Sequence, residues 1–175
     1  MNNVTFVGIT RNNEYPKEIK TDGFGEVIIK TNSPSVFQRY LEAEKAKNNI
    51  IYVQDDDAVV DYKELWKHYN DQLTNGITQH HQLYYKNSGV TLVGWGCFFP
   101  KKMLKEFHRY IDKYGTDEHL LREADRIFTY LNQPHNSIVM EHQDFAPQVG
   151  RMWNEPHHWE SMRQAIEKCR LLEIK

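Results

Sequence analysis

The sequence predicts an α/β fold with a largely parallel central sheet. Short runs rich in Val, Ile and aromatic residues alternate with segments that have the apolar spacing of amphipathic helices. Such alternation places the helices as connections between parallel strands. The 175 residues, 39% hydrophobic and 26% charged, suit one globular domain with one core, and we find no linker or repeat that divides them.

The first third of the chain is expected to supply three strands. These strands are residues 4–10, 26–30 and 49–53. Asn32-Ser33-Pro34 offers a helix cap followed by proline, and the spacing of residues 36–47 predicts a helix before the third strand. Asp61 is expected to cap a further helix that continues to about Leu73.

The rest of the chain continues the alternation. The expected elements are a strand at 89–99 that two glycines interrupt, helices at 100–114 and about 120–131, a strand at 137–140 and a helix at 159–172. The 100–114 helix has an apolar stripe and an opposite, basic stripe. The basic stripe consists of Lys102, Lys105, Arg109 and Lys113.

The net charge and the cysteine content indicate which partners and which cellular compartment to expect. A net charge of -2 gives no global basic field, so a nucleic-acid partner would need a local basic patch. Cys97 and Cys169 fit no metal or redox spacing, and we expect reduced thiols in a cytoplasmic protein, or in the host cytoplasm if the chain is viral. The sequence shows no signal peptide and no membrane span, so we expect no membrane insertion.

The most informative motif is the acidic triplet Asp55-Asp56-Asp57. It directly follows the apolar run Ile50–Val53, and ligands of open α/β sheets bind beyond the carboxyl ends of strands. Adjacent carboxylates repel one another, and a divalent cation would relieve that repulsion and also hold phosphates. The alternative is a solvated acidic turn or a cap for the next helix.

Residues 51–57 resemble the DxD segment of glycosyltransferases with the GT-A fold. Four other segments occur in the order in which that family has them. They are residues 4–11, the helix with Arg39, Gly94-Trp95-Gly96-Cys97-Phe98-Phe99-Pro100, and Glu123-Ala124-Asp125-Arg126-Ile127-Phe128. The compact chain is similar to small bacteriophage glycosyltransferases, including the kind that modifies DNA bases.

This resemblance implies a GT-A-like, Rossmann-type sheet, mostly parallel and flanked by helices. Residues of about 1–60 would form the nucleotide-sugar donor half, and residues of about 77–175 the acceptor half and the C-terminal closure over metal and donor. The implied cofactor is Mn²⁺ or Mg²⁺, and the implied donor is a UDP-sugar. The implied donor contacts are Thr10, Arg11, Arg39, Asp55 and Asp56, and the implied metal ligands are Asp55, Asp57 and one of His157 and His158.

Inverting glycosyl transfer needs a carboxylate that removes the acceptor's proton. We expect Asp125 in this role, with Glu123 in reserve; in a retaining enzyme, Asp125 would position the acceptor. The family usually has adjacent Glu-Asp, whereas Glu123 and Asp125 would point about 200° apart on a continuous helix, so that one alone faces the site. Asp117-Glu118 is a rival pair.

Acceptor binding is expected around Gly94, Trp95 and Gly96. Glycine allows close approach to a ligand, and Trp95 can stack on a sugar or base; the alternative is a bulge beside a core tryptophan. The basic stripe on residues 102–113 follows this segment, which makes a hydroxylated base in DNA a candidate acceptor beside a saccharide. The alternative is a solvated helix face.

Two other functions stay open. A nucleotidyltransferase on a related sheet would need a glycine-rich loop after the first strand, and Arg11–Glu14 contains no glycine. A non-catalytic nucleotide-sugar-binding module would keep the acidic triplet and need no base. The expected function is therefore metal-dependent hexosyl transfer from a nucleotide-sugar to a hydroxyl group, with these two alternatives.

Overall fold

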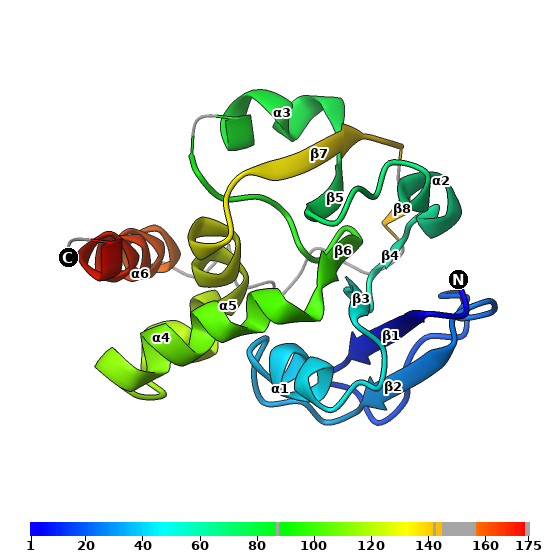
Figure 1. Ribbon diagram of the computed structural model, residues 1–175, viewed down its shortest axis with the longest axis horizontal. Coiled ribbons are helices and arrows are strands. Elements are labelled where there is room, and N and C mark those ends of the chain that lie inside the picture. The colour runs from blue at the N-terminus through cyan, green and yellow to red at the C-terminus, as the bar shows by residue number, and fades with distance from the viewer. Residues whose placement is uncertain (87, 142, 145–156, 174–175) are drawn as a thin grey trace.

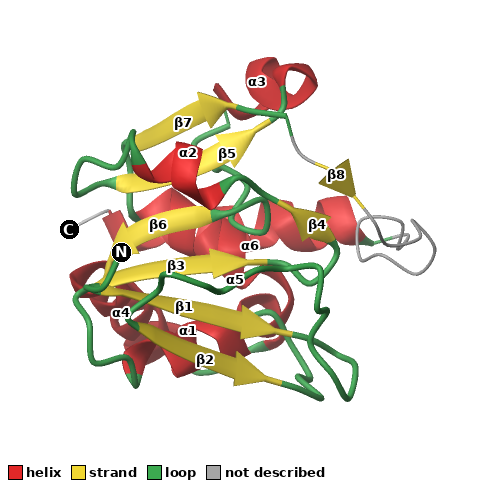
Figure 2. Ribbon diagram, turned by 90° about the vertical axis from the view of Figure 1, so that its right-hand side faces the viewer, coloured by secondary structure: helices red, strands yellow, loops and turns green. Residues whose placement is uncertain are grey.

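The computed structural model describes residues 1–86, 88–141, 143–144 and 157–173, which form an α/β structure with a mixed sheet flanked by helices (Figures 1 and 2). The main sheet contains β1 (Val4–Ile9), β2 (Glu26–Lys30), β3 (Ile50–Gln54), β5 (Leu73–Ile77), β6 (Cys97–Pro100) and β7 (His135–Val139). A second, two-stranded sheet contains β4 (Ala58–Val59) and β8 (Gln143–Asp144).

The helices are α1 (Gln38–Glu44), α2 (Tyr62–Trp66), α3 (Gln79–Lys86), the 3-10 helix η1 (Lys101–Leu104), α4 (Lys105–Tyr114), α5 (Glu118–Leu131) and α6 (His158–Glu173). Among the described residues, none of these helices is both long and apolar enough to cross a lipid bilayer. Four of them, α1, α4, α5 and α6, lie on one face of the sheet, and α2 lies on the other (Figure 2).

The strand order β2-β1-β3-β6-β5-β7 determines where a ligand can bind. Of the described strands in this sheet, β6 alone runs antiparallel to its neighbours. The carboxyl ends of the other five strands and the amino end of β6 therefore share one edge. At that edge the chain leaves β1 toward β2 on one side and leaves β3 toward β5 on the other, and such a reversal is where open α/β sheets bind ligands.

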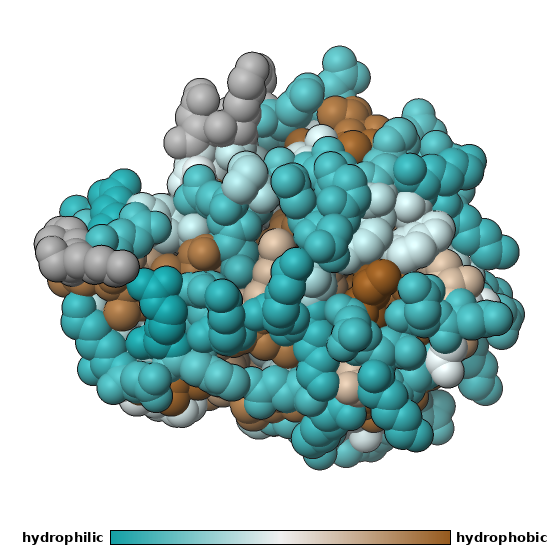
Figure 3. Space-filling model, in the orientation of Figure 1, coloured by the Kyte–Doolittle hydropathy of each residue, from teal (hydrophilic) through white to brown (hydrophobic). Residues whose placement is uncertain are grey.

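Aromatic residues fill the core on both faces of the sheet, whereas hydrophilic residues cover most of the molecular face seen in Figure 3. On the α1–α4–α5 side, the rings of Phe107 and Phe128 stack with centroids 5.3 Å apart, and Tyr40 packs against both. On the α2 side, Tyr52 packs against Phe98 with centroids 4.5 Å apart. The sheet is thus held between two apolar layers, which fixes its polar edge relative to α1 and α5.

The expected α/β class is confirmed, and the first three expected strands match β1, β2 and β3; the sheet itself is mixed, because β6 pairs antiparallel with β3 and β5. The prediction of a helix from Asp61 to about Leu73 was too long. Asp61 does cap α2 by accepting a hydrogen bond from the Glu64 N–H, but the helix ends at Trp66. The buried strand β5 begins at Leu73, and its Asn75 and Gly76 are poor strand formers, which hid it.

The glycine-interrupted segment also differs from its prediction. Of the expected 89–99 strand, only residues 97–99 belong to the observed strand β6, which continues to Pro100. Gly96 has a positive φ of 85°, and a side chain there would meet the Tyr52 hydroxyl, so the chain turns into β6 at this glycine. Helix α3 was not expected from the sequence.

Asp117, one of the rival base candidates, is a structural residue at the start of α5. Its carboxylate accepts a hydrogen bond from the Leu120 N–H at 2.8 Å and one from Lys168 of α6 at 2.6 Å. Burial acts to raise the pKa of Asp117, but the bonds from Lys168 and Leu120 outweigh it and hold the pKa below its usual value. Asp117 thus caps α5 and ties it to α6.

Asp117→Ala should lower the free energy of unfolding by about 1–2 kcal/mol, because it removes a helix cap. Since the pKa is depressed in the folded state, the carboxylate stabilises the fold above its unfolded pKa, and this contribution disappears as pH falls through the folded pKa. Urea denaturation at pH 7 and in acid measures both effects. Asp112→Ala, at an exposed position on α4, is the matched control. An equal loss in the two variants would contradict the assignment.

Candidate functional site

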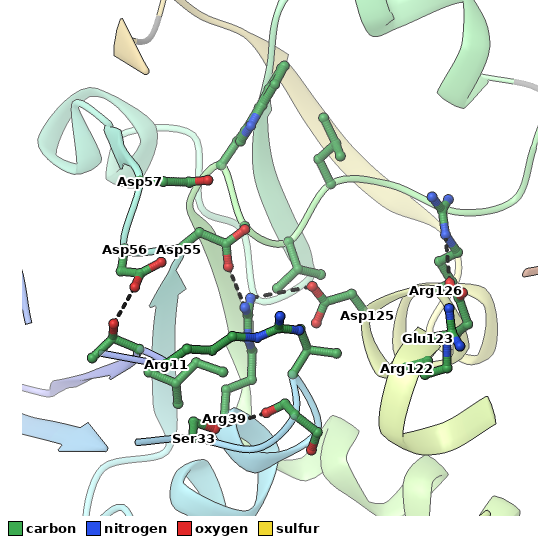
Figure 4. Close-up of a pocket in the computed structure, with 18 of the residues that line it drawn as sticks. Arg11, Ser33, Arg39, Asp55, Asp56, Asp57, Arg122, Glu123, Asp125 and Arg126 are labelled. Carbon is green, nitrogen blue, oxygen red and sulfur yellow. Dashed lines mark hydrogen bonds and ion pairs between the residues drawn. The ribbon is translucent and has the colours of Figure 1, made fainter. Parts of the chain in front are cut away.

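A pocket of about 470 Å³ lies at the edge that the carboxyl ends of the parallel strands share (Figure 4). Its walls come from the loop after β1, the start of α1, the acidic loop after β3, the segment before β6, and the middle of α5. Its volume lies in the range of small-molecule sites. It occupies the crevice between β1 and β3 where the connections diverge.

The structure brings most of the sequence-predicted site residues to this pocket. Those that line it are Thr10, Arg11, Arg39, Asp55, Asp56, Asp57, Gly94, Trp95, Glu123, Asp125 and His158. Gly96 and His157 are not among the described residues that line it. His157 is exposed, and Gly96 makes the turn into β6.

The centre of the site is an arginine held between two carboxylates. Arg39 of α1 has a side chain only 2% exposed; its Nη2 donates to Asp55, and its Nη1 lies 3.4 Å from Oδ2 of Asp125 (Figure 4). The Tyr40 hydroxyl donates to the other Asp125 oxygen at 2.7 Å. Residues from α1, from the end of β3 and from α5 thus meet at one buried positive charge.

The acidic loop is fixed to the first strand. The Thr10 hydroxyl, at the end of β1, donates a hydrogen bond to Asp56. The same hydroxyl accepts a bond from the Asn12 N–H at 3.1 Å, so it links the two loops that flank the crevice. Asp57 lines the pocket beyond them, and Figure 4 shows the three aspartates along one side of the site.

Gly94 makes room for the Asp55 carboxylate. The Asp55 N–H donates to the Gly94 carbonyl at 2.9 Å, and a Cβ on Gly94 would lie 1.8 Å from Oδ2 of Asp55. The sequence interpretation gave this glycine to the acceptor. In the structure, its missing side chain is required by the acidic loop itself.

Helix α5 is kinked where it lines the pocket. Glu123 has non-helical torsions, φ -115° and ψ 24°, and both Glu123 and Asp125 line the site. The expectation that one alone would face the site assumed a continuous helix, and the kink at Glu123 removes that assumption. Glu123 is buried and lies 3.1 Å from Nε of Arg126 and 3.4 Å from Nδ1 of His158.

Asp125 has the environment of a proton acceptor. Burial raises its pKa; Arg39 and the Tyr40 hydrogen bond act against this, the negative charge of Asp55 adds to it, and the pKa lies above the usual aspartate range. Its side chain is still 25% exposed, toward the pocket. A carboxylate of raised pKa at a cleft is suited to general-base chemistry.

The sequence interpretation missed the basic residues of α5. Arg122 and Arg126 also line the pocket, so it has arginines on the α5 wall as well as Arg11 and Arg39 near the aspartates (Figure 4). Arg122 and Arg126 are four residues apart, with Asp125 between them, and residues at this spacing lie on the same side of a helix. This spacing was the signal in the sequence for a basic wall beside Asp125. The mixed charge of the pocket suits an anionic ligand bound together with a cation.

Trp95 packs against α3, the helix that the sequence did not predict. The ring of His81, on α3, meets the Trp95 ring edge-on with centroids 4.7 Å apart, and its Nδ1 lies 2.8 Å from the Thr78 hydroxyl. Trp95 is half-buried and lines the pocket. Trp95 therefore presents an aromatic surface at the edge of the site, and its packing against His81 keeps that surface in place.

The basic stripe does not belong to this site. Because β6 is antiparallel, it carries the chain away from the pocket, and Lys101 at its far end donates to the Asn49 carbonyl at the opposite edge of the sheet. Within the described structure, Lys102, Lys105, Arg109 and Lys113 do not line the pocket. Lys102 pairs with Asp71 at 3.0 Å, and Lys113 donates to the Leu171 carbonyl. The stripe therefore does not lie at the pocket that holds Gly94 and Trp95, the residues expected to bind the acceptor.

The carboxylates offer oxygen ligands without forming a complete metal cage. Among the described residues, no group of three or more His, Cys, Asp or Glu side chains is arranged to hold a metal ion. His158 instead contacts Glu123 and Arg126, with 3.1 Å between its Nε2 and Nη2 of Arg126. Any cation here would take part of its coordination from a ligand or water.

Comparison of the chain with protein-family models, with curated proteins and with solved structures finds no match. The geometry of the pocket is therefore what indicates a function for this chain. That geometry consists of a crevice at the strand ends, an acidic loop, a buried arginine and a carboxylate of raised pKa.

Gly94→Ala should lower the free energy of unfolding by about 1–3 kcal/mol, as expected for overpacking of a tight site. The added Cβ would displace the Asp55 carboxylate from its place beside Arg39. In an Asp55→Ala background the cost should be much smaller, because the overlapping atoms are gone. Urea denaturation of the four proteins measures the coupling. An undiminished cost in the Asp55→Ala background would show that Gly94 is required for another reason.

Proposed function

We propose that the protein is a metal-dependent glycosyltransferase of the GT-A type, which transfers a sugar from a nucleotide-sugar, a UDP-sugar in the first instance, to a hydroxyl acceptor. The observation that carries the proposal is the Asp55–Arg39–Asp125 arrangement inside the crevice between β1 and β3. It brings an acidic loop suited to a cation and a carboxylate suited to accept a proton into one pocket. The mixed α/β sheet and the DxD-like position of residues 55–57 support the same family.

The donor is proposed to bind on the β1–β3 side. Mg²⁺ is typically held by one or two protein carboxylates plus substrate phosphates, and Mn²⁺ also accepts such oxygen ligands. Asp55 and Asp57 fit this mode, since they supply carboxylates without a full protein cage. The metal would neutralise negative charge on the departing nucleoside diphosphate. Thr10, Arg11 and Asp56 would hold the nucleotide portion beside it.

The acceptor is proposed to bind between Trp95 and α5. Asp125 would take the proton of the acceptor hydroxyl while the hydroxyl oxygen attacks the anomeric carbon of the donor sugar. The bond from that carbon to the phosphate oxygen breaks, and the nucleoside diphosphate leaves with the electron pair. Glu123 is engaged with Arg126 and His158, which favours Asp125 as the base.

Two kinds of acceptor are proposed, a saccharide and a hydroxylated base in DNA. Trp95 offers a surface on which either a sugar or a base can stack. The basic stripe of α4 no longer favours DNA, because it starts at the opposite edge of the sheet. The DNA proposal therefore depends on the likeness to small phage enzymes, and a parallel screen of saccharides and hydroxymethylated DNA separates the two.

Asp57→Asn should abolish transfer, because it removes a carboxylate that the proposal gives to the metal. Turnover of UDP-sugars is measured with added Mn²⁺ and after chelation, and circular dichroism checks that the variant folds. Asp71→Asn, at an exposed position outside the pocket, is the matched control. Full activity of Asp57→Asn in excess chelator would exclude a metal at this loop.

Asp125→Asn should lower turnover at least about 100-fold, in line with the loss of a general base. At saturating metal, the affinity for donor should change little, because Asp125 faces the acceptor side. In the wild type, activity should fall as pH drops through the raised pKa of Asp125, since only the ionised carboxylate accepts a proton. Measurements of turnover against pH, with donor titrations, check each point.

Two controls make the base assignment specific. Glu123→Gln tests the other carboxylate of the kinked helix, and Asp117→Asn tests the capping residue. A nearly wild-type Asp125→Asn beside an inactive Glu123→Gln would move the base to Glu123. Donor binding without transfer or hydrolysis in the wild type would point to a non-catalytic nucleotide-sugar-binding module.

A further inference from the structure

Arg39 has more hydrogen-bonding capacity than its present partners use. Among the described residues, its Nε and Nη1 atoms are buried and make no hydrogen bond, although Nη1 faces Asp125 at 3.4 Å. A buried charge of this kind needs its anionic partners, because it is cut off from water. Arg39 therefore has unused donors with which to form closer contacts to one carboxylate if it loses the other.

The two carboxylates beside Arg39 are more accessible than the arginine. The side chain of Asp55 is 37% exposed and that of Asp125 is 25% exposed, against 2% for Arg39. Asp55 also belongs to the acidic loop that faces the pocket. A cation in that loop would compete with Arg39 for the same Asp55 carboxylate, since both are positive charges seeking its oxygens.

From this competition, which rests on the proposed function, we infer that Arg39 is a positioning residue that couples cation binding at Asp55 to the placement of Asp125. When the cation draws the Asp55 carboxylate away, the buried guanidinium is left with Asp125 as its charged partner. Asp125 is then held more firmly between Arg39 and the Tyr40 hydroxyl. The base is thus fixed in place when the donor side of the pocket is loaded.

The coupling must act in both directions. If a cation at Asp55 strengthens the contact between Arg39 and Asp125, then the Asp125 carboxylate must strengthen cation binding by the same factor. Asp125 does so by giving Arg39 an alternative partner, so that Asp55 is released at lower cost. This reciprocity can be measured without any turnover, on the binding of Mn²⁺ alone.

The experiment is isothermal titration calorimetry of Mn²⁺ into the wild type and two pairs of variants. Arg39→Gln should raise the affinity for Mn²⁺ at least about fivefold, because it removes the competitor for Asp55. Arg126→Gln removes the same charge from the pocket wall but no partner of Asp55, and it should stay within about twofold of the wild type. A residue that only supported the fold would lower the affinity when replaced.

The second pair of variants tests the reverse direction of the coupling, in which Asp125 strengthens cation binding. Asp125→Asn should lower the affinity for Mn²⁺ at least about fivefold, whereas Glu123→Gln, on the same kinked helix, should stay within about twofold. In the Arg39→Gln background, Asp125→Asn should have no further effect, which distinguishes coupling through Arg39 from direct attraction between Asp125 and the cation. If Arg39→Gln does not fold, the Asp125 and Glu123 pair decides.

The outcomes separate the inference from the proposed function. Equal or weaker Mn²⁺ binding by a folded Arg39→Gln, or equal effects of Asp125→Asn and Glu123→Gln, would overturn the coupling. Absence of Mn²⁺ binding by the wild type, both alone and with UDP, would instead contradict the proposed metal site and the inference with it.

Discussion

The buried guanidinium of Arg39 is the constraint on which the rest of the pocket depends. An arginine side chain 2% exposed is stable only with anionic partners, because the protein interior does not replace the water it loses. One partner, Asp55, lies at the end of β3, the next element after α1, whereas the other, Asp125, belongs to α5, which comes after β5 and β6 in the chain. Satisfying one charge therefore fixes the first strands of the sheet relative to the helices that follow β6.

The antiparallel strand β6 completes the site from the opposite direction. Because β6 starts at the edge where β1 and β3 end, the residues just before it, Gly94 and Trp95, return to the pocket. Gly94 then serves the acidic loop in two ways: its carbonyl accepts the Asp55 N–H, and its missing side chain leaves space for the Asp55 carboxylate. The backbone of one loop thus sets the position of a charged side chain in another.

The sequence was informative wherever local pattern and strand ends decide the structure. The apolar runs at β1, β2 and β3 predicted those strands, and the position of Asp55 after one of them predicted its place at the sheet edge. The contact between Arg39 and Asp125 joins residues far apart in sequence, and no local pattern indicates it. Likewise, the basic stripe follows Gly94 closely in sequence, but the direction of β6 sends it to the other edge.

The kink at Glu123 gives two neighbouring carboxylates different environments. Glu123 is buried and surrounded by Arg126 and His158, so its negative charge is already matched by groups of the α5–α6 wall. Asp125 remains open to the pocket, with a pKa raised by burial and by the nearby Asp55 charge, and with Arg39 and Tyr40 holding it in place. A carboxylate that is oriented, accessible and readily protonated can exchange a proton with a bound hydroxyl, whereas one enclosed by counter-charges stabilises its wall. The break in the helix therefore allows one short segment to supply both the support of the site and its proposed base.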